Sequence, residues 1–306
     1  MGVFLAALSA FVFAINNVVV KKGQAESKHS GDTGLFITVF MNVIILGIVF
    51  FVAVLVREGA FHFSWTALLF FMIAGLCTTG LGRMTLFSSI SYIGPSKASA
   101  IRNTTPIFTT IFALIFLNET ITLFPGTGMI LLLSGILYEG YRFFQSGNDL
   151  LFDQTQQKQQ LVGYGLALLS AMIFGIGQGV RKQGLLELND AFFGAWIGAV
   201  TSFIFLILYQ SLRKGWRTNI VRSFTSLNPY YLLAGILTSI GPLLFFLAAQ
   251  SIQISYVSVV AATEPLMTII ISTIFLKRQE RITIHTWITI TMILLGTILM
   301  VMFIPK

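Results

Sequence analysis

Charged residues are scarce in this chain, and their scarcity limits the class of protein it can be. Only 10% of the 306 residues are Asp, Glu, Lys or Arg, whereas 56% are hydrophobic. A soluble domain usually carries about a quarter charged residues, and no soluble fold of this length could bury so much apolar surface. The composition therefore excludes a soluble globular protein and predicts an integral membrane protein.

Cysteine and histidine are nearly absent as well. The one cysteine, Cys77, excludes an intramolecular disulfide, and the three histidines lie at the edges of apolar segments. There is no zinc-ligand spacing, phosphate-binding loop or nucleophile triad, so the sequence predicts no metal, no cofactor and no enzyme activity. The net charge of +8 comes without basic stretches interleaved with aromatics. This pattern argues against nucleic-acid binding and fits Lys and Arg in cytoplasmic loops.

Long apolar runs, by contrast, fill most of the chain. A membrane-spanning helix needs about 20 apolar residues, and ten such runs lie at residues 2–22, 34–56, 67–92, 97–117, 124–144, 162–186, 190–212, 230–252, 255–276 and 283–304. A polar linker at residues 145–160 separates residues 1–144 from residues 161–306. We therefore predict an all-α membrane protein with ten transmembrane helices, five on each side of the linker.

The two halves of the chain repeat one another. Residues 2–23 align without gaps with residues 163–184, and the alignment pairs Ser9 with Ser170. Further along, Pro106 aligns with Pro265. Because each repeat has five spans, an odd number, the second copy must enter the membrane upside down. Such inverted five-helix repeats are typical of secondary transporters, whose substrate site lies near the midplane between the repeats.

One motif occurs in both halves and carries a family resemblance. It reads "TTPIFTTIFALIFLNETIT" at residues 104–122 and "TEPLMTIIISTIFLKRQERIT" at residues 263–283. With ten helices, this motif resembles the EamA-type branch of the drug/metabolite transporter superfamily. The resemblance implies a polytopic transporter, often an exporter of amino acids, drugs or other metabolites. The second motif departs from the pattern by two extra residues before its glutamate.

Arg102 lies inside an apolar run, where a charge is unfavourable by about 2.5–3.5 kcal/mol unless it faces protein, water or a partner. Thr105 shares its helix face and aligns with Glu264, the only carboxylate deep inside any predicted span. We expect all three to face one central cavity. One interpretation is a charged pair that lines the substrate path, with Glu264 carrying a coupling proton. The other is a structural ion pair that joins the two halves.

Further candidates lie near this cavity. Arg83 is either inside the third span or an interfacial residue that reaches the lipid headgroups. Asn16 and Asn17 align with Gly177 and Gln178, and these amides either contact substrate or hydrogen-bond neighbouring helices. The prolines are expected to weaken helix hydrogen bonding and to direct carbonyls toward the cavity. The full set of candidate substrate-binding and helix-breaking residues is Arg102, Glu264, Thr105, Arg83, Asn17, Gln178, Asn16, Pro106 and Pro265.

The cavity candidates are more positive than negative, which favours anionic or zwitterionic substrates. The sequence thus predicts a secondary transporter, an exporter, of a small polar metabolite such as an amino acid or organic acid. It would work by alternating access in a prokaryotic plasma membrane, with a proton as candidate coupling ion. A multidrug exporter of apolar compounds and a lipid-head-group flippase are the alternatives. One chain is sufficient for both repeats, and a homodimer is compatible with the sequence.

The membrane orientation has two conflicting signals. Most Lys and Arg fall in the odd-numbered loops, which places both termini outside by the positive-inside rule. The family resemblance implies termini inside, so the sequence leaves both orientations open.

Overall fold

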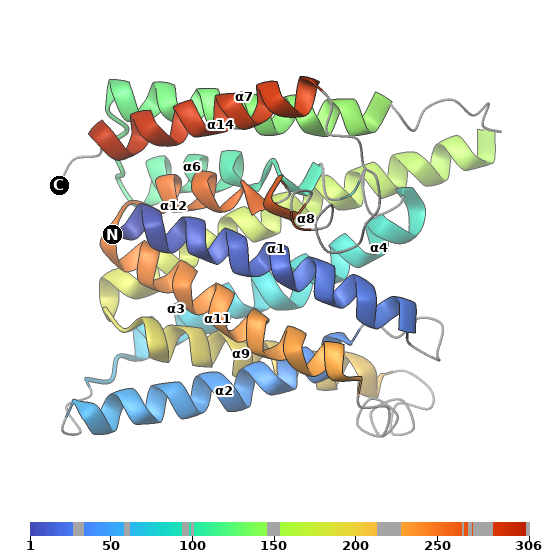
Figure 1. The fold of residues 1–306 in the computed structure, drawn as a ribbon. Coiled ribbons are helices and arrows are strands. Elements are labelled where there is room, and N and C mark those ends of the chain that lie inside the picture. Colours follow the sequence, from blue (N-terminus) through green and yellow to red (C-terminus); the bar gives the residue numbers. More distant parts are fainter. Residues whose placement is uncertain are drawn as a thin grey trace.

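The computed structural model describes residues 1–26, 34–57, 62–93, 98, 101–145, 154–212, 228–264, 266–268, 271 and 284–303. Within these ranges every regular element is a helix, as Figure 1 shows. The first half contains α1 (Gly2–Glu26), α2 (Leu35–Val56), α3 (Trp65–Gly75), the π-helix η1 (Leu76–Gly82), α4 (Arg83–Ile93), α6 (Thr105–Phe116) and α7 (Leu123–Gln145). The second half contains α8 (Gln154–Glu187), α9 (Ala191–Ser211), α11 (Pro229–Ser251), α12 (Ile254–Ala261) and α14 (Ile284–Phe303).

Six helical stretches of the described chain are long and apolar enough to cross a membrane. They are Gly2–Val20, Leu35–Val56, Trp65–Leu86, Gln159–Glu187, Ala191–Ser211 and Pro229–Ser251. The apolar helices Thr105–Phe116 and Leu123–Gly135 are shorter. The all-helical class is therefore confirmed, whereas ten crossings and their inverted arrangement stay predictions.

Helix α8 begins inside the expected linker. It begins at Gln154, so the second part of the expected linker continues into the sixth predicted span as one helix. The reason lies in the glutamine-rich sequence there, since Gln has a good helix propensity although it adds no hydropathy. Hydropathy locates only the part of a helix that is apolar enough for lipid.

Helices from the two halves pack against each other. Helix α1 packs on α11, and α8 packs on α3, η1, α4 and α6. Helix α2 lies against α9 and α11. Helices α7 and α14 form a pair along one side of the molecule, at the top of Figure 1. The halves are thus interleaved and do not form two separate bodies.

Small residues allow the closest of these approaches. A Cβ atom added to Gly75 of α3 would lie 2.5 Å from the carbonyl oxygen of Gly198 in α9. Such contacts let two backbones meet without intervening side chains, as is common between helices in membranes.

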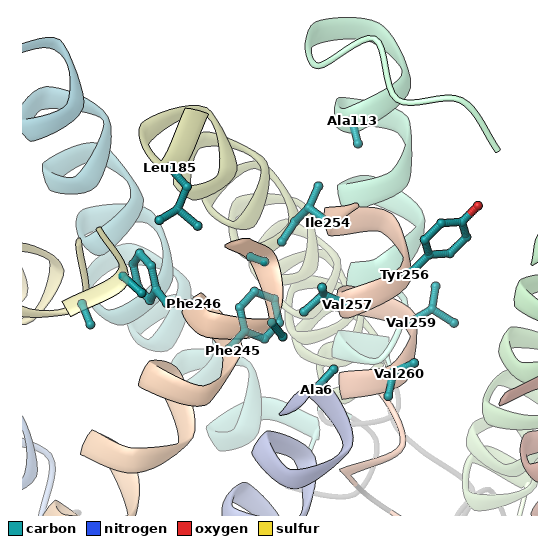
Figure 2. Close-up of a cluster of buried hydrophobic side chains, with 14 of the residues drawn as sticks. Ala6, Ala113, Leu185, Phe245, Phe246, Ile254, Tyr256, Val257, Val259 and Val260 are labelled. Atoms are coloured by element: carbon teal, nitrogen blue, oxygen red, sulfur yellow. The ribbon is translucent and has the colours of Figure 1, made fainter. Parts of the chain in front are cut away.

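The core centres on the short helix α12. Its side chains Ile254, Tyr256, Val257, Val259 and Val260 are at most 1% exposed. Figure 2 shows them next to Ala6 of α1, Ala113 of α6, Leu185 of α8 and Phe245 of α11. Helix α12 is therefore surrounded by protein from Ile254 to Val260.

The outer faces of the helix bundle are also apolar. Leu55, Leu123 and Met302 are exposed by 76%, 77% and 70%, and many other large hydrophobic side chains also face outward. Soluble proteins rarely expose contiguous apolar surface on this scale. A lipid environment accounts for it.

Candidate functional site

Two helix breaks position the charged residues. The segment before α6 turns at Asn103 and Thr104, and Pro106 occupies the first turn of α6. A proline is tolerated there because the first N–H groups of a helix have no intrahelical partner. In the second half, α12 ends at Ala261 and the chain turns again just before Glu264. Arg102 and Glu264 thus flank aligned interruptions, and half-helix ends of this kind form binding sites in transporters.

Arg102 and Glu264 form an ion pair between the two halves of the chain. Their Nη2 and Oε2 atoms are 3.4 Å apart, and the two side chains are 27% and 15% exposed. The Asn17 side-chain amide donates to the other oxygen of Glu264 at 2.7 Å. The Arg102 guanidinium also lies 5.3 Å from the ring centre of Phe174 on α8. The Glu264 carboxylate therefore contacts Arg102 and Asn17 and remains partly exposed.

Thr105 has a local role in this structure. It is 8% exposed, and its hydroxyl donates to the Arg102 carbonyl at 2.6 Å. It therefore closes the turn at the helix break, although the sequence places it at the position that aligns with Glu264. The acidic group is present in only one half, so the site is asymmetric.

The two amides on α1 and α8 contact equivalent threonines. Asn17 donates to the Thr268 hydroxyl at 3.3 Å, and Gln178 accepts from the Thr109 hydroxyl at 2.9 Å. Each threonine is the third residue after an aligned proline. Sequence reasoning missed both threonines, although their common spacing from Pro106 and Pro265 was a usable signal.

Arg83 belongs to the same charged group. It is the first residue of α4, directly after η1, and its half-buried side chain lies within electrostatic range of Arg102 and Glu264. The helical stretch continues past Arg83 to Ile93, whereas the part apolar enough to cross a membrane ends at Leu86, so both interpretations of Arg83 stay open. Two arginines therefore face one carboxylate, and the described group has an excess positive charge.

Asn16 does not join this group. It is 9% exposed, and its Oδ1 atom is buried without a hydrogen-bond partner among the described residues. Consecutive residues on a helix point about 100° apart, so Asn17 alone reaches Glu264. Pro265 lies outside the described residues.

The glutamate of the repeated motif has a role that the sequence did not reveal. Glu119 accepts hydrogen bonds from the Ile254 N–H at 2.7 Å and from the Ser255 N–H at 3.2 Å. It also accepts from the Ser255 hydroxyl at 2.7 Å. Asn118, two residues after the end of α6, has φ of 51°, a left-handed conformation that Asn tolerates just past a helix end. The motif thus ties the end of α6 to the start of α12.

Lys182 on α8 also binds backbone groups. Its Nζ donates to the carbonyls of Ala249 and Ile252, where α11 ends. Those carbonyls have no intrahelical partners, and a cation is favourable at this end of the helix dipole. Lys182 therefore joins α8 to α11.

The group around Glu264 has the chemistry of an anion or proton site. A carboxylate next to an arginine can stay ionised and paired, or it can lose the arginine to another anion. Within the described ranges, no three His, Cys, Asp or Glu residues come together in a way that could hold a metal.

Comparisons with known proteins agree with this architecture. Residues 1–138 and 161–302 match the model of the EamA-like transporter family. The chain is 22% identical to Solute carrier family 35 member G1 of Homo sapiens, over 71% of the chain and 57% of that protein. It is 25% identical to the uncharacterized transporter YoaV of Bacillus subtilis, over 67% of the chain and 66% of that protein. The matched region therefore spans little more than half of the human relative.

A crystal structure has the same fold. It superimposes with a TM-score of 0.70 at 15% sequence identity, and the match covers 97% of this chain and 94% of the other. At this identity the likeness concerns the fold alone.

Proposed function

The chain belongs to the EamA-like transporter family, and from this membership we propose that it is a secondary transporter of a small anionic or zwitterionic metabolite, such as an amino acid or organic acid. It is a membrane-embedded, multi-pass protein. In our proposal it exports this metabolite from a prokaryotic cell by alternating access between two inverted five-helix repeats.

The observation that carries the proposal is the charged group between the two halves. Arg102 and Glu264 come from different halves and remain 27% and 15% exposed, and Arg83 adds a second positive charge nearby. A site with two cations and one anion attracts a carboxylate and repels a cation. An arginine fork also matches the geometry of a carboxylate.

Matching hydrogen bonds support the repeat arrangement. The Ser9 hydroxyl donates to the Gly241 carbonyl at 2.8 Å, and the Ser170 hydroxyl donates to the Gly82 carbonyl at 2.8 Å. Ser9 and Ser170 are aligned residues, and the two glycines stand at the same distance before the aligned prolines. Each bond joins one half to the other, as expected for two halves related by pseudo-twofold symmetry.

The ion pair provides a means of coupling. A substrate carboxylate that binds Arg102 competes with Glu264 for the same cation. Once released, Glu264 is free to bind a proton. Anion binding and proton binding at one site are then linked, which is the requirement for a proton-coupled transporter.

The test is metabolite profiling of cells that produce the wild type or the Arg102→Ala variant at matched membrane levels. We expect one anionic or zwitterionic species to redistribute between cytoplasm and medium with the wild type only. Arg57→Ala is the matched control, because Arg57 belongs to a different ion pair. Its Nη1 lies 2.8 Å from Oδ2 of Asp190. Redistribution of hydrophobic cations would overturn the proposed substrate class. An unchanged metabolite pool would favour a flippase.

A further inference from the structure

A further arginine, half-buried like Arg83, lies on α8. Arg181 is one turn beyond Gln178 on that helix, and its guanidinium carbon lies 4.3 Å from the ring centre of Phe246 and 5.2 Å from that of Phe245. These rings belong to the buried cluster of Figure 2 and are 3% and 4% exposed. The guanidinium is therefore packed against buried aromatic rings.

Arg181 lacks the acidic partner that Arg102 has. No ion pair joins it to a carboxylate within the described ranges, and its buried Nε has no hydrogen-bond partner there. Among the described residues its polar contact is a long one, 3.4 Å from Nη2 to the hydroxyl of Thr78. Aromatic faces offset part of the unfavourable free energy of a desolvated cation, but they offer no strong acceptor to the buried Nε. A bound anion would supply such an acceptor.

The position of Arg181 relates it to the first charged group. Phe174, which lies under Arg102, and Arg181 are two turns apart on α8, or about 10 Å along the helix. Helix η1 connects the two places, because Thr78 lies within η1 and Arg83 follows its end. The approach of η1 to α8 is close here, since a Cβ at Gly177 would lie 2.8 Å from Thr78. π-Helical turns of this kind occur frequently at functional sites.

We infer that Arg181, with Thr78 and the two phenylalanine faces, forms a second anion-binding station on the substrate path. This inference rests on the proposed function and extends it. The carboxylate of the substrate binds at Arg102 in one stage of transport and at Arg181 in another. A path with two separate cationic stations is suited to move an anion through the protein without trapping it.

One test does not require the substrate. The Arg181→Cys variant of the full chain, which also carries Cys77→Ser, is reconstituted in lipid vesicles. It is then treated with two thiol reagents of equal size. One is the anionic sulfonatoethyl methanethiosulfonate and the other is the cationic trimethylammonioethyl methanethiosulfonate. Asn189→Cys, at an exposed position after the same helix, supplies the reference rates. We expect labelling at position 181, with the anionic reagent favoured at least about threefold over its reference ratio, because a path that passes Arg83 and Arg102 attracts anions. Absent labelling, or a ratio equal to the reference, overturns the station.

A second test uses the metabolite that the wild type redistributes. Arg181→Gln is expected to raise the half-saturating concentration by about tenfold to a hundredfold, the effect of losing a hydrogen bond to a charged group. Arg181→Lys should recover only part of this loss, because an ammonium lacks the planar fork. Lys182→Gln, its neighbour, should lower thermal stability and leave the half-saturating concentration unchanged.

The two proposals fail differently. If the wild type moves no anionic or zwitterionic species, the proposed function is wrong. If it moves one and Arg102→Ala abolishes transport while Arg181→Gln leaves the half-saturating concentration unchanged, the proposed function stands and the second station is wrong.

Discussion

The ion pair between Arg102 and Glu264 allows a quantitative prediction for a double-mutant cycle. The atoms lie 3.4 Å apart, which corresponds to about 5 kcal/mol of attraction at an effective dielectric constant of about 20. Partial exposure of both side chains and the length of the contact reduce this value. We expect a coupling free energy of about 1–2 kcal/mol between Arg102→Met and Glu264→Gln.

The single variants should differ in a defined way. Glu264→Gln retains an oxygen that accepts from Asn17 but removes the charge, so Arg102 and Arg83 repel each other without compensation. We expect a loss of about 1–3 kcal/mol in the free energy of unfolding. This loss corresponds to a fall of about 2–10 °C in the melting temperature. The double variant should lose little more than Glu264→Gln alone, because Arg102→Met removes the unpaired cation.

Thermal unfolding of the purified chain in detergent, followed by tryptophan fluorescence, measures the cycle. A coupling below about 0.5 kcal/mol would refute the reasoning, since distant and independent sites add to within that margin. Transport of the charge-reversed pair, Arg102→Glu with Glu264→Arg, separates a structural bridge from a transport role. Recovered stability without recovered transport identifies the transport role, and recovery of both identifies a bridge.

Three further predictions concern packing and hydrogen bonds, and thermal unfolding tests each of them. Gly75→Ala should lower the free energy of unfolding by about 1–3 kcal/mol, because its Cβ would meet the α9 backbone. Gly165→Ala is the control, since nothing lies within 4 Å of its Cβ, and it should be neutral or stabilising by up to about 1 kcal/mol. Glu119→Ala should lower the free energy of unfolding by about 2 kcal/mol, and Glu119→Gln should lower it by roughly half as much. Equal losses for the two variants would contradict capping of α12 by a carboxylate. Ser9→Ala and Ser170→Ala should each lower the free energy of unfolding by about 0.6 kcal/mol, and the two losses should add in the double variant. Clearly unequal losses would contradict equivalent contacts.

The family and the helical class followed from the sequence. The resemblance in the repeated motif is confirmed by the match to the EamA-like transporter family over both halves of the chain. Apolar runs located the helices well, as Leu35–Val56 and Pro229–Ser251 show against the predicted intervals 34–56 and 230–252. This success has a simple cause, since a helix in lipid must satisfy its backbone internally and present apolar side chains all along its length.

The sequence also indicated that Arg102 and Glu264 lie close together. An arginine within an apolar run needs a partner, and the alignment of Pro106 with Pro265 placed Glu264 in the equivalent region of the other half. The structure then brought Arg102 and Glu264 together. It also showed the Thr105 hydroxyl bonded to the Arg102 carbonyl, because a hydroxyl near a helix break readily bonds the carbonyl three residues earlier, and a substrate contact of Thr105 stays a prediction.

Other parts of the site depend on where helices from opposite halves meet. Glu119 as a cap for α12, Lys182 as a ligand of the α11 carbonyls, and the stacking of Arg181 on two phenylalanines join residues far apart in the chain. Hydropathy and self-similarity describe each helix by itself, and they carry no information on which face meets which neighbour. The sequence by itself therefore determined the membrane class, the repeat and the charges that need partners. Only the tertiary structure decided which partners they find, because side-chain contacts between helices depend on the rotation and crossing of each pair.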